Sequence, residues 1–184
     1  MNRIILASSS PRRKELLETA GVEFEIHVKE VDESVPEGTA PADAAVMTAT
    51  KKAQAVAGSF RDSVVIGADT IVVCDNRILG KPQSKENAAA MLRMLSGREH
   101  EVITGVCLIK NEAMRSFAKI SKVKFYNLTD EEIDKYVSTG ESMDKAGAYG
   151  IQGLGCTLVE SIEGDYFNIV GLPVASVVRE INKI

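Results

Sequence analysis

Residues 64–73 have the sequence VVIGADTIVV, and this stretch decides the fold class. Its run of branched apolar residues predicts a long central strand. Asp69 is the only ionisable residue in the stretch, and removing an unpaired carboxylate from water is costly. Asp69 therefore needs a cation nearby. It is a metal ligand or a base, or it simply marks a strand end or a bulge. Gly67, two positions earlier on the same face, lets a ligand or another backbone approach closely.

The segments on both sides of this strand alternate between strand and helix patterns. Before it, the patterns predict a strand at 3–7, a helix from Pro11 to Gly21, a half-buried strand at 22–28 and a helix from Pro41 to about Gly58. After it, they predict a turn at 75–76 with a return strand at 78–79, a helix between Ser84 and Gly97, strands at 101–110 and 117–126 joined through Asn111, a helix from Thr129 to about Gly140, a strand at 157–162 and a final helix from Pro173 to Ile184.

The expected hairpins interrupt the regular alternation of strand, helix and strand. A mixed sheet therefore suits the sequence better than an all-parallel one. We predict an α/β fold in which a mixed β-sheet carries helices on its faces. We expect it to form a single domain over residues 1–184, with two lobes around one sheet.

The composition is that of an ordinary soluble globular protein. Hydrophobic residues make up 45% and charged residues 26% of the 184 residues, which is too apolar for intrinsic disorder. The net charge of −4 and the aromatic fraction of 5%, with no Trp, disfavour a nucleic-acid polymer as partner. No run approaches the ~18–20 apolar residues of a membrane span, and residues 1–10 are too short for a signal peptide. We expect a cytoplasmic protein that binds no membrane.

The cysteines and histidines offer little material for chemistry. Cys74, Cys107 and Cys156 are widely spaced among apolar residues and Thr, so we expect small buried hydrophobic side chains rather than a metal cluster or disulfides. His27 and His100 are isolated, which disfavours a histidine metal site or a Ser/His/Asp triad. The chemistry must therefore use carboxylates, cations and backbone groups.

The segment SSSPRRK, residues 8–14, is the first candidate binding site. It joins an expected strand to the start of an expected helix, where unpaired N–H groups and the helix dipole favour an anion. Three consecutive cations in a first helical turn oppose that dipole unless a negative ligand lies among them, and an Arg fork suits phosphate oxygens. The segment indicates a phosphate site. The plain alternative is a solvated basic turn after a Ser cap.

Further candidates are charged residues outside this segment. Asp32 and Glu33 in an acidic loop could supply a second carboxylate for Mg²⁺, which takes one or two carboxylates plus substrate phosphates, although loop acids are commonly solvated. Lys52 lies on an expected helix, and Lys81 lies on a constrained bend between Gly80 and Pro82. Read singly, either lysine is most often a plain surface residue.

The segment GAYGIQG, residues 147–153, is too rich in glycine for a regular element and leaves its backbone open to a ligand. Its Gln152 is the one side chain there that both donates and accepts hydrogen bonds. A flexible loop is the plain alternative. The chain contains no Walker loop and no Gly-x-Gly-x-x-Gly motif. This excludes ordinary P-loop proteins, kinases and Rossmann-type dinucleotide-binding proteins.

Taken together, these motifs resemble the Maf family essentially from end to end. The matching segments are residues 8–13, 31–33, 52–53, 67–70, 80–82, 95–97, 144–153, 164–166 and 170–173. The resemblance implies a two-lobed mixed α/β fold with a central cleft, similar to that of inosine triphosphatases. It also implies a nucleoside triphosphate pyrophosphatase, which cleaves a nucleotide between its α- and β-phosphates.

The resemblance also implies roles for individual residues. Asp69 would be the proton acceptor and, with Glu33, would hold a divalent metal cation, Mg²⁺, Mn²⁺ or Co²⁺. The residues that would bind the triphosphate are Ser8, Arg12, Arg13, Lys52 and Lys81. The residues that would select the base are Arg12, Thr70 and Gln152, and these three are similar to those of the branch that acts on dTTP and UTP. The family also suggests a homodimer.

Two other functions are compatible with this resemblance. The family name comes from inhibition of septum formation, so one alternative is a regulatory protein that binds a cell-division partner without turnover. A binding module would have no need for Asp69 among several cations. The other alternative is a house-cleaning pyrophosphatase for inosine or xanthosine triphosphate, which the three base-selecting residues support poorly.

Overall fold

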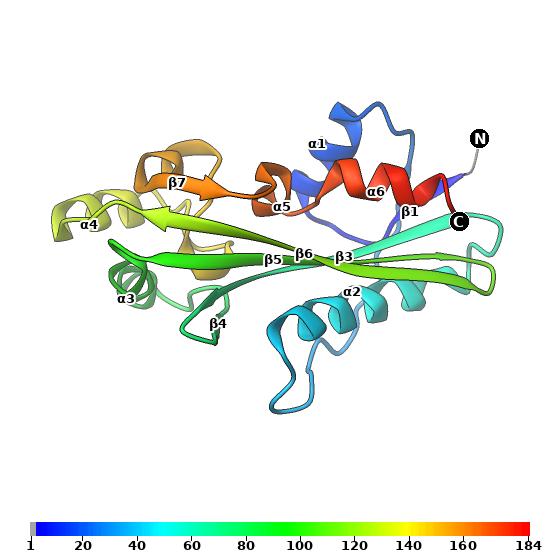
Figure 1. Ribbon diagram of the computed structural model, residues 1–184, viewed down its shortest axis with the longest axis horizontal. Helices are drawn as coiled ribbons and strands as arrows, with labels where there is room; N and C mark the ends of the chain where they lie inside the picture. Colours follow the sequence, from blue (N-terminus) through cyan, green and yellow to red (C-terminus); the bar gives the residue numbers. More distant parts are fainter. Residues whose placement is uncertain (1–2) are drawn as a thin grey trace. The chain divides into compact units, whose positions relative to one another are not determined.

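The computed structural model describes residues 3–184 and contains a mixed seven-stranded sheet with helices against it (Figure 1). The strands are β1 (Ile4–Leu6), β2 (Glu25–Ile26), β3 (Val64–Cys74), β4 (Arg77–Leu79), β5 (Glu99–Lys110), β6 (Ala113–Phe125) and β7 (Val159–Glu163). The helices are α1 (Pro11–Thr19), α2 (Pro41–Ala57), α3 (Lys85–Leu95), α4 (Asp130–Ser138), α5 (Tyr166–Val170) and α6 (Val174–Ile181), with 3₁₀ helices η1 (Ala146–Ala148) and η2 (Gly153–Leu158). Within this part of the chain, no helix is both long and apolar enough to cross a membrane.

The strand order is β2-β1-β3-β5-β6-β7, and β4 pairs with β3. β1 pairs in parallel with β2 and β3, whereas the β3–β4 and β6–β7 pairs are antiparallel. The predicted mixed sheet is therefore confirmed, and β3 lies inside it as expected. The turn between β3 and β4 uses Asp75 and Asn76 at φ values of 50° and 59°, which are typical of a tight hairpin turn.

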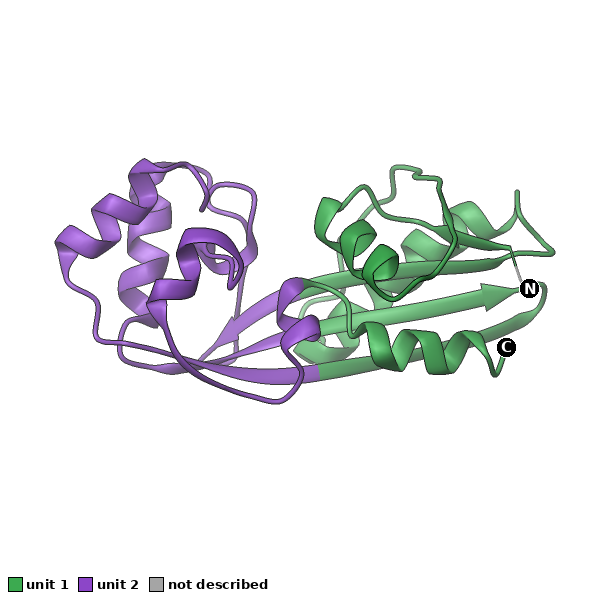
Figure 2. Cartoon of the chain, turned by 90° about the horizontal axis from the view of Figure 1, so that it is seen from above, with its two compact units in different colours: residues 1–70, 104–119, 171–184 green, residues 71–103, 120–170 purple. Residues whose placement is uncertain are grey.

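The chain divides into two compact units (Figure 2). Unit 1 contains the residues up to Thr70 together with residues 104–119 and 171–184, and unit 2 contains residues 71–103 and 120–170. β3, β5 and β6 each contribute residues to both units. Two lobes on one sheet are thus observed, as the sequence predicts.

In unit 1, helix α2 lies unusually close to the sheet. A Cβ atom added at Gly67 of β3 would lie 2.2 Å from the backbone oxygen of Ala49. One added at Gly105 of β5 would lie 2.4 Å from the backbone oxygen of Ala45. Ala45 and Ala49 are fully buried. The close approach of a backbone predicted at Gly67 is therefore that of α2.

In unit 2, α3 and α4 pack together over a core that the aromatic residues help to fill. Phe125 and Tyr149 meet edge to face with ring centroids 4.6 Å apart, and the His100 ring lies edge-on to both. Thr129 begins α4 with the predicted capping box, because its side chain and that of Glu132 bond each other's backbone.

Three local expectations are wrong. The strand expected at 22–28 is only two residues long, and Ile26 and Val28 remain 43% and 52% exposed. Its neighbour β1 has only three residues, so it offers little backbone for pairing. Cys156 is exposed, unlike the buried Cys74 and Cys107, because it lies in η2 rather than in the core. The short helix α5 has no counterpart among the predicted elements.

Candidate active site

The predicted phosphate segment lies at the start of α1. Ser10 is the N-cap, with its Oγ accepting a 3.5 Å hydrogen bond from the Arg13 N–H, and Pro11 begins the helix. The Ser10 N–H in turn donates to Ser8 Oγ at 3.3 Å. The helix therefore begins with basic side chains beside N–H groups at its positive end, an arrangement that suits an anion.

Arg13 is buried, and each of its guanidinium nitrogens donates to the protein. Nε donates to the Gly171 oxygen at 2.9 Å, Nη1 to Ser8 Oγ at 3.0 Å and Nη2 to Thr70 Oγ1 at 3.1 Å. Burial lowers the pKa of the Arg13 guanidinium, whereas the charge of nearby Asp69 opposes that change. Each terminal nitrogen carries a second N–H, so Arg13 can hold this part of the site together and still bind an anion.

The Thr70 hydroxyl lies at the centre of a hydrogen-bond network. It accepts from Arg13, lies 2.9 Å from Thr104 Oγ1 and donates to the Gly171 oxygen at 3.3 Å. A hydroxyl has one donor and two acceptor positions, and these three partners fill them when Thr104 is the donor in its hydrogen bond to Thr70. Thr70 can therefore influence a ligand by its shape and position, but not by a further hydrogen bond of its own.

Asp69 is paired with a cation, as expected for a carboxylate in an apolar strand. Lys52 Nζ lies 2.7 Å from Asp69 Oδ1 and 3.1 Å from Glu33 Oε1. The side chains of Lys52 and Asp69 are each 17% exposed, whereas that of Glu33 is 58% exposed. Asp69 lies inside β3, two residues from the glycine that admits α2, so the packing of α2 brings Lys52 to it. One ammonium thus joins the two predicted metal ligands.

The two neighbouring loop acids differ in their contacts. Asp32 accepts hydrogen bonds from the Ser34 hydroxyl at 2.7 Å and from the Ser34 backbone N–H at 2.9 Å. These bonds lower the pKa of the Asp32 carboxyl. Lys51 on α2 fixes the same loop by donating to the Asp32 and Ser34 carbonyl oxygens. Glu33, and not Asp32, is therefore the loop acid held beside Asp69.

The carboxylates of Glu33 and Asp69 are of the type that a divalent cation binds. Among residues 3–184, no group of three or more His, Cys, Asp or Glu side chains forms a candidate metal centre. Mg²⁺, however, commonly uses only one or two carboxylates and completes its shell with water and phosphate oxygens. Glu33 and Asp69, which both contact the Lys52 ammonium, supply that number of carboxylates.

Lys81 and Gln152 belong to unit 2. Lys81 is exposed after β4, and Gln152 is half-buried at the start of η2. The Gly147 N–H donates to the Gly80 oxygen at 3.0 Å, which ties the bend of Lys81 to the glycine-rich segment. That segment contains the last two residues of η1 and the first residue of η2 rather than one long irregular loop.

Two groups that shape this site could not be recognised from the sequence. Thr104 is fully buried in β5 and contacts Thr70, but a Thr within a β-type run carries no functional signal. The Gly171 oxygen accepts from Arg13, and a carbonyl oxygen has no signature in a sequence.

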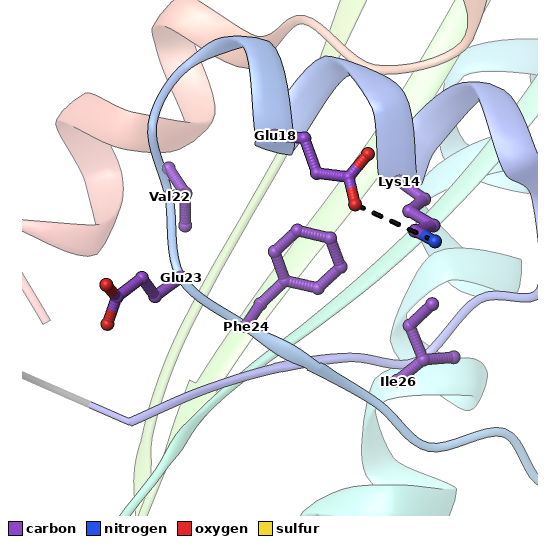
Figure 3. Close-up of a pocket in the computed structure, with 6 residues that line it drawn as sticks. All are labelled: Lys14, Glu18, Val22, Glu23, Phe24 and Ile26. Carbon is purple, nitrogen blue, oxygen red and sulfur yellow. Dashed lines mark ion pairs between the residues drawn. The ribbon is translucent and has the colours of Figure 1, made fainter.

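A pocket of about 460 Å³ lies elsewhere in unit 1 (Figure 3). It is lined by Lys14, Glu18, Val22, Glu23, Phe24 and Ile26. Figure 3 shows Phe24 pointing toward the Lys14–Glu18 ion pair, whose atoms are 3.7 Å apart. Lys14 is the one residue of the predicted phosphate segment that lines this pocket, and none of the residues of the cluster around Asp69 does.

Comparison with known proteins identifies the family. A HAM1 protein from Coxiella burnetii has a similar fold, with a TM-score of 0.55, 14% identity and full coverage of both chains. A protein of Geobacillus sp. (strain WCH70) named dTTP/UTP pyrophosphatase is 53% identical over 184 residues, covering 100% of this chain and 99% of the relative. A protein of the same name from Bacillus cytotoxicus is 52% identical over 183 residues, covering 100% and 96%. The family model described as Maf-like protein matches residues 3–184. The chain therefore belongs to the Maf-like protein family.

Proposed function

We propose that this protein is a nucleoside triphosphate pyrophosphatase that hydrolyses dTTP and UTP to the monophosphate and pyrophosphate. The relatives described above carry this activity in their names and match the chain over its full length. The observation that carries the proposal is the cluster in which Lys52 contacts both Asp69 and Glu33. It offers a base and a cation on packed elements and a second carboxylate on a loop, which suits water attack on an anionic phosphate.

Asp69 acts as the proton acceptor in the proposed reaction. Water attacks the α-phosphorus, and the bond from this atom to the oxygen that bridges to the β-phosphate breaks. Asp69 takes the proton from the water, and pyrophosphate leaves with the electron pair of the broken bond. Lys52, at 2.7 Å from Oδ1, holds the Asp69 carboxylate in place.

Glu33 and Asp69 would hold the divalent metal cation that the resemblance implies. Their oxygen atoms suit Mg²⁺, Mn²⁺ or Co²⁺, among which oxygen ligands discriminate only weakly. When bound, such an ion makes water more acidic and clamps the phosphoryl oxygens.

The triphosphate is assigned to Ser8, Arg12, Arg13, Lys52 and Lys81. The N-terminus of α1 supports this assignment, because its N–H groups and cations suit phosphate oxygens. The choice of base is assigned to Arg12, Thr70 and Gln152. Since the hydrogen-bonding capacity of Thr70 is filled, we assign base hydrogen bonds to Arg12 and Gln152 and a shape effect to Thr70.

The test is to incubate the purified protein with dTTP, UTP, CTP, GTP, ITP and 7-methyl-GTP, each with Mg²⁺ or Mn²⁺. The products are separated so that monophosphate with pyrophosphate is distinguished from diphosphate with phosphate. We expect pyrophosphate from dTTP and UTP. Asp69→Asn should lose about 10²- to 10⁴-fold in kcat, the usual contribution of a general base, while nucleotide binding persists.

The other outcomes separate the alternatives. A near-normal rate for Asp69→Asn would refute the assignment of Asp69 as proton acceptor. Preference for ITP would favour the purine house-cleaning function. No turnover of any nucleotide by folded protein would favour either the regulatory function through a binding partner or a modified nucleotide outside this panel as the substrate.

A further inference from the structure

Gln152 lies in a short loop whose two ends touch. A Cβ atom added at Gly155 would lie 2.1 Å from the Gly150 oxygen and 2.9 Å from the Tyr136 hydroxyl oxygen. Only a residue without a side chain fits there, so the backbone at Gly155 passes directly over that at Gly150. Gln152 lies between these closed ends.

Two side chains from outside the loop bind its backbone at this closure. The Tyr136 hydroxyl accepts a hydrogen bond from the Gly150 N–H at 3.3 Å and donates to Glu141 Oε1 at 3.1 Å. Glu141 Oε1 also accepts from the Gly155 N–H at 3.1 Å, and Oε2 accepts from the Leu154 N–H at 3.0 Å. Tyr136 and Glu141, which we call the loop clamp, therefore bind the backbone on both sides of Gln152.

The clamp is itself held in place. Lys145 Nζ donates to the Glu141 backbone oxygen at 2.6 Å, and the Glu141 N–H donates to Thr139 Oγ1 at 3.2 Å. Burial raises the pKa of the Tyr136 phenol, with the charge of Glu141 adding to this effect, so the hydroxyl stays a donor. Partial burial raises the pKa of the Glu141 carboxyl, but the N–H groups of Leu154 and Gly155 outweigh it and hold this pKa below its ordinary value.

A carboxylate is the group that this position requires. Its two oxygens accept from two backbone N–H groups and one hydroxyl, and hydrogen bonds to a charged acceptor are stronger than neutral ones. An amide at the same position offers only one acceptor oxygen and turns N–H donors toward other donors. The clamp thus depends on the charge of Glu141 as well as on its size.

We propose that Glu141 and Tyr136 are positioning residues that set nucleotide selectivity by fixing the loop that carries Gln152. This inference rests on the proposed function, in which Gln152 contacts the base. Neither clamp residue touches the substrate; they fix the backbone from which Gln152 projects. Loosening the clamp should therefore weaken the choice of base more than the chemical step at Asp69.

The experiment compares Glu141→Gln and Tyr136→Phe with the wild-type chain. The readouts are kcat and KM for dTTP and CTP, and amide hydrogen exchange at residues 150, 154 and 155. We expect faster exchange and a fall of about ten- to a hundredfold in the ratio of kcat/KM for dTTP over CTP, the size expected for one or two lost hydrogen bonds to a charged group. The loss should appear in KM, with kcat for dTTP within about threefold of wild type.

Matched controls carry the same chemical changes on the surface of the same unit. Glu131→Gln at an exposed position of α4 and Tyr126→Phe at a residue that is 52% exposed should leave both readouts unchanged. Gln152→Ala provides the reference for complete loss of the base contact. If Glu141→Gln does not fold, Tyr136→Phe alone decides, because it removes one hydroxyl and keeps the ring.

The outcomes distinguish this inference from the function on which it rests. If Gln152→Ala leaves the dTTP/CTP ratio unchanged, the proposed base contact is wrong, and this inference falls with it. If Gln152→Ala lowers the ratio but the clamp variants do not, only the inference is wrong. Faster exchange with an unchanged ratio would also overturn it, because the clamp would then serve stability alone.

Discussion

At pH 5 the protein should be less stable than at pH 7.5 by about 2 kcal/mol because of one buried histidine, His100. His100 is 3% exposed, its ring lies edge-on to Phe125 and Tyr149, and its Nε2 lies 2.7 Å from the Tyr149 hydroxyl oxygen. Its Nδ1 has no hydrogen-bond partner within the described part of the chain. Burial therefore lowers the pKa of His100 from 6.5 to about 4.

The sign and size of the effect follow from proton linkage. The unfolded chain binds a proton at His100 below pH 6.5, whereas the folded protein resists protonation until about pH 4. This contribution to stability is complete above pH 6.5 and is lost as the pH falls toward 4. With ~1.4 kcal/mol for each unit of pKa difference, the loss reaches about 2 kcal/mol at pH 5 and about 3 kcal/mol near pH 4.

The assay is urea unfolding of the wild type and His100→Gln at pH 7.5 and pH 5. Glutamine can keep a hydrogen bond to Tyr149 but does not titrate. The free energy of unfolding of the wild type should fall by about 2 kcal/mol more than that of the variant between these pH values. Equal changes in the two proteins would show that His100 does not titrate as its burial requires, and would refute the reasoning.

Three further predictions concern the site around Asp69. Thr70→Val should lower the free energy of unfolding by about 1–3 kcal/mol, because Arg13 loses a buried partner, while the dTTP/CTP ratio stays within about twofold; loss of that ratio would mean that the hydroxyl contacts the base. Gly67→Ala should destabilise the protein by about 1–3 kcal/mol or more, since its Cβ would overlap the Ala49 oxygen, and an unchanged Tm would contradict the close approach of α2. Removing divalent ions with EDTA should stop release of pyrophosphate from dTTP, and Mg²⁺ or Mn²⁺ should restore it; full activity in EDTA would exclude the metal role of Glu33 and Asp69.

Elements with strong local signals could be predicted from the sequence. The apolar run at 64–73 forms β3, Pro41 begins α2, and Ser84 and Thr129 cap helices as expected. These features depend on residues close together in the chain, so local physics decides them. The lengths of the edge strand β2 and of the short helix α5 depend on the segments that pack or pair with them. No local sequence pattern encodes those contacts.

Only some of the contacts around Asp69 could be predicted from the sequence. A lone Asp69 in an apolar strand predicted a nearby cation, and Lys52 is that cation. The pattern could not show that Lys52 would also hold Glu33, because that contact joins a loop to a helix. Nor could it show that Arg13 would bond Thr70 and Gly171, which are distant in sequence.

The contact between α2 and the sheet makes four small residues interdependent: Ala45, Ala49, Gly67 and Gly105. Backbone meets backbone there, so no layer of side chains can adopt other rotamers when the spacing changes. A larger residue at any of these positions must increase the distance between α2 and the sheet, and this moves Lys52 away from Asp69. Among relatives that catalyse the same reaction, these four positions should therefore keep small residues or change together. Covariation among residues that carry no functional group would then reflect the distance between Lys52 and Asp69.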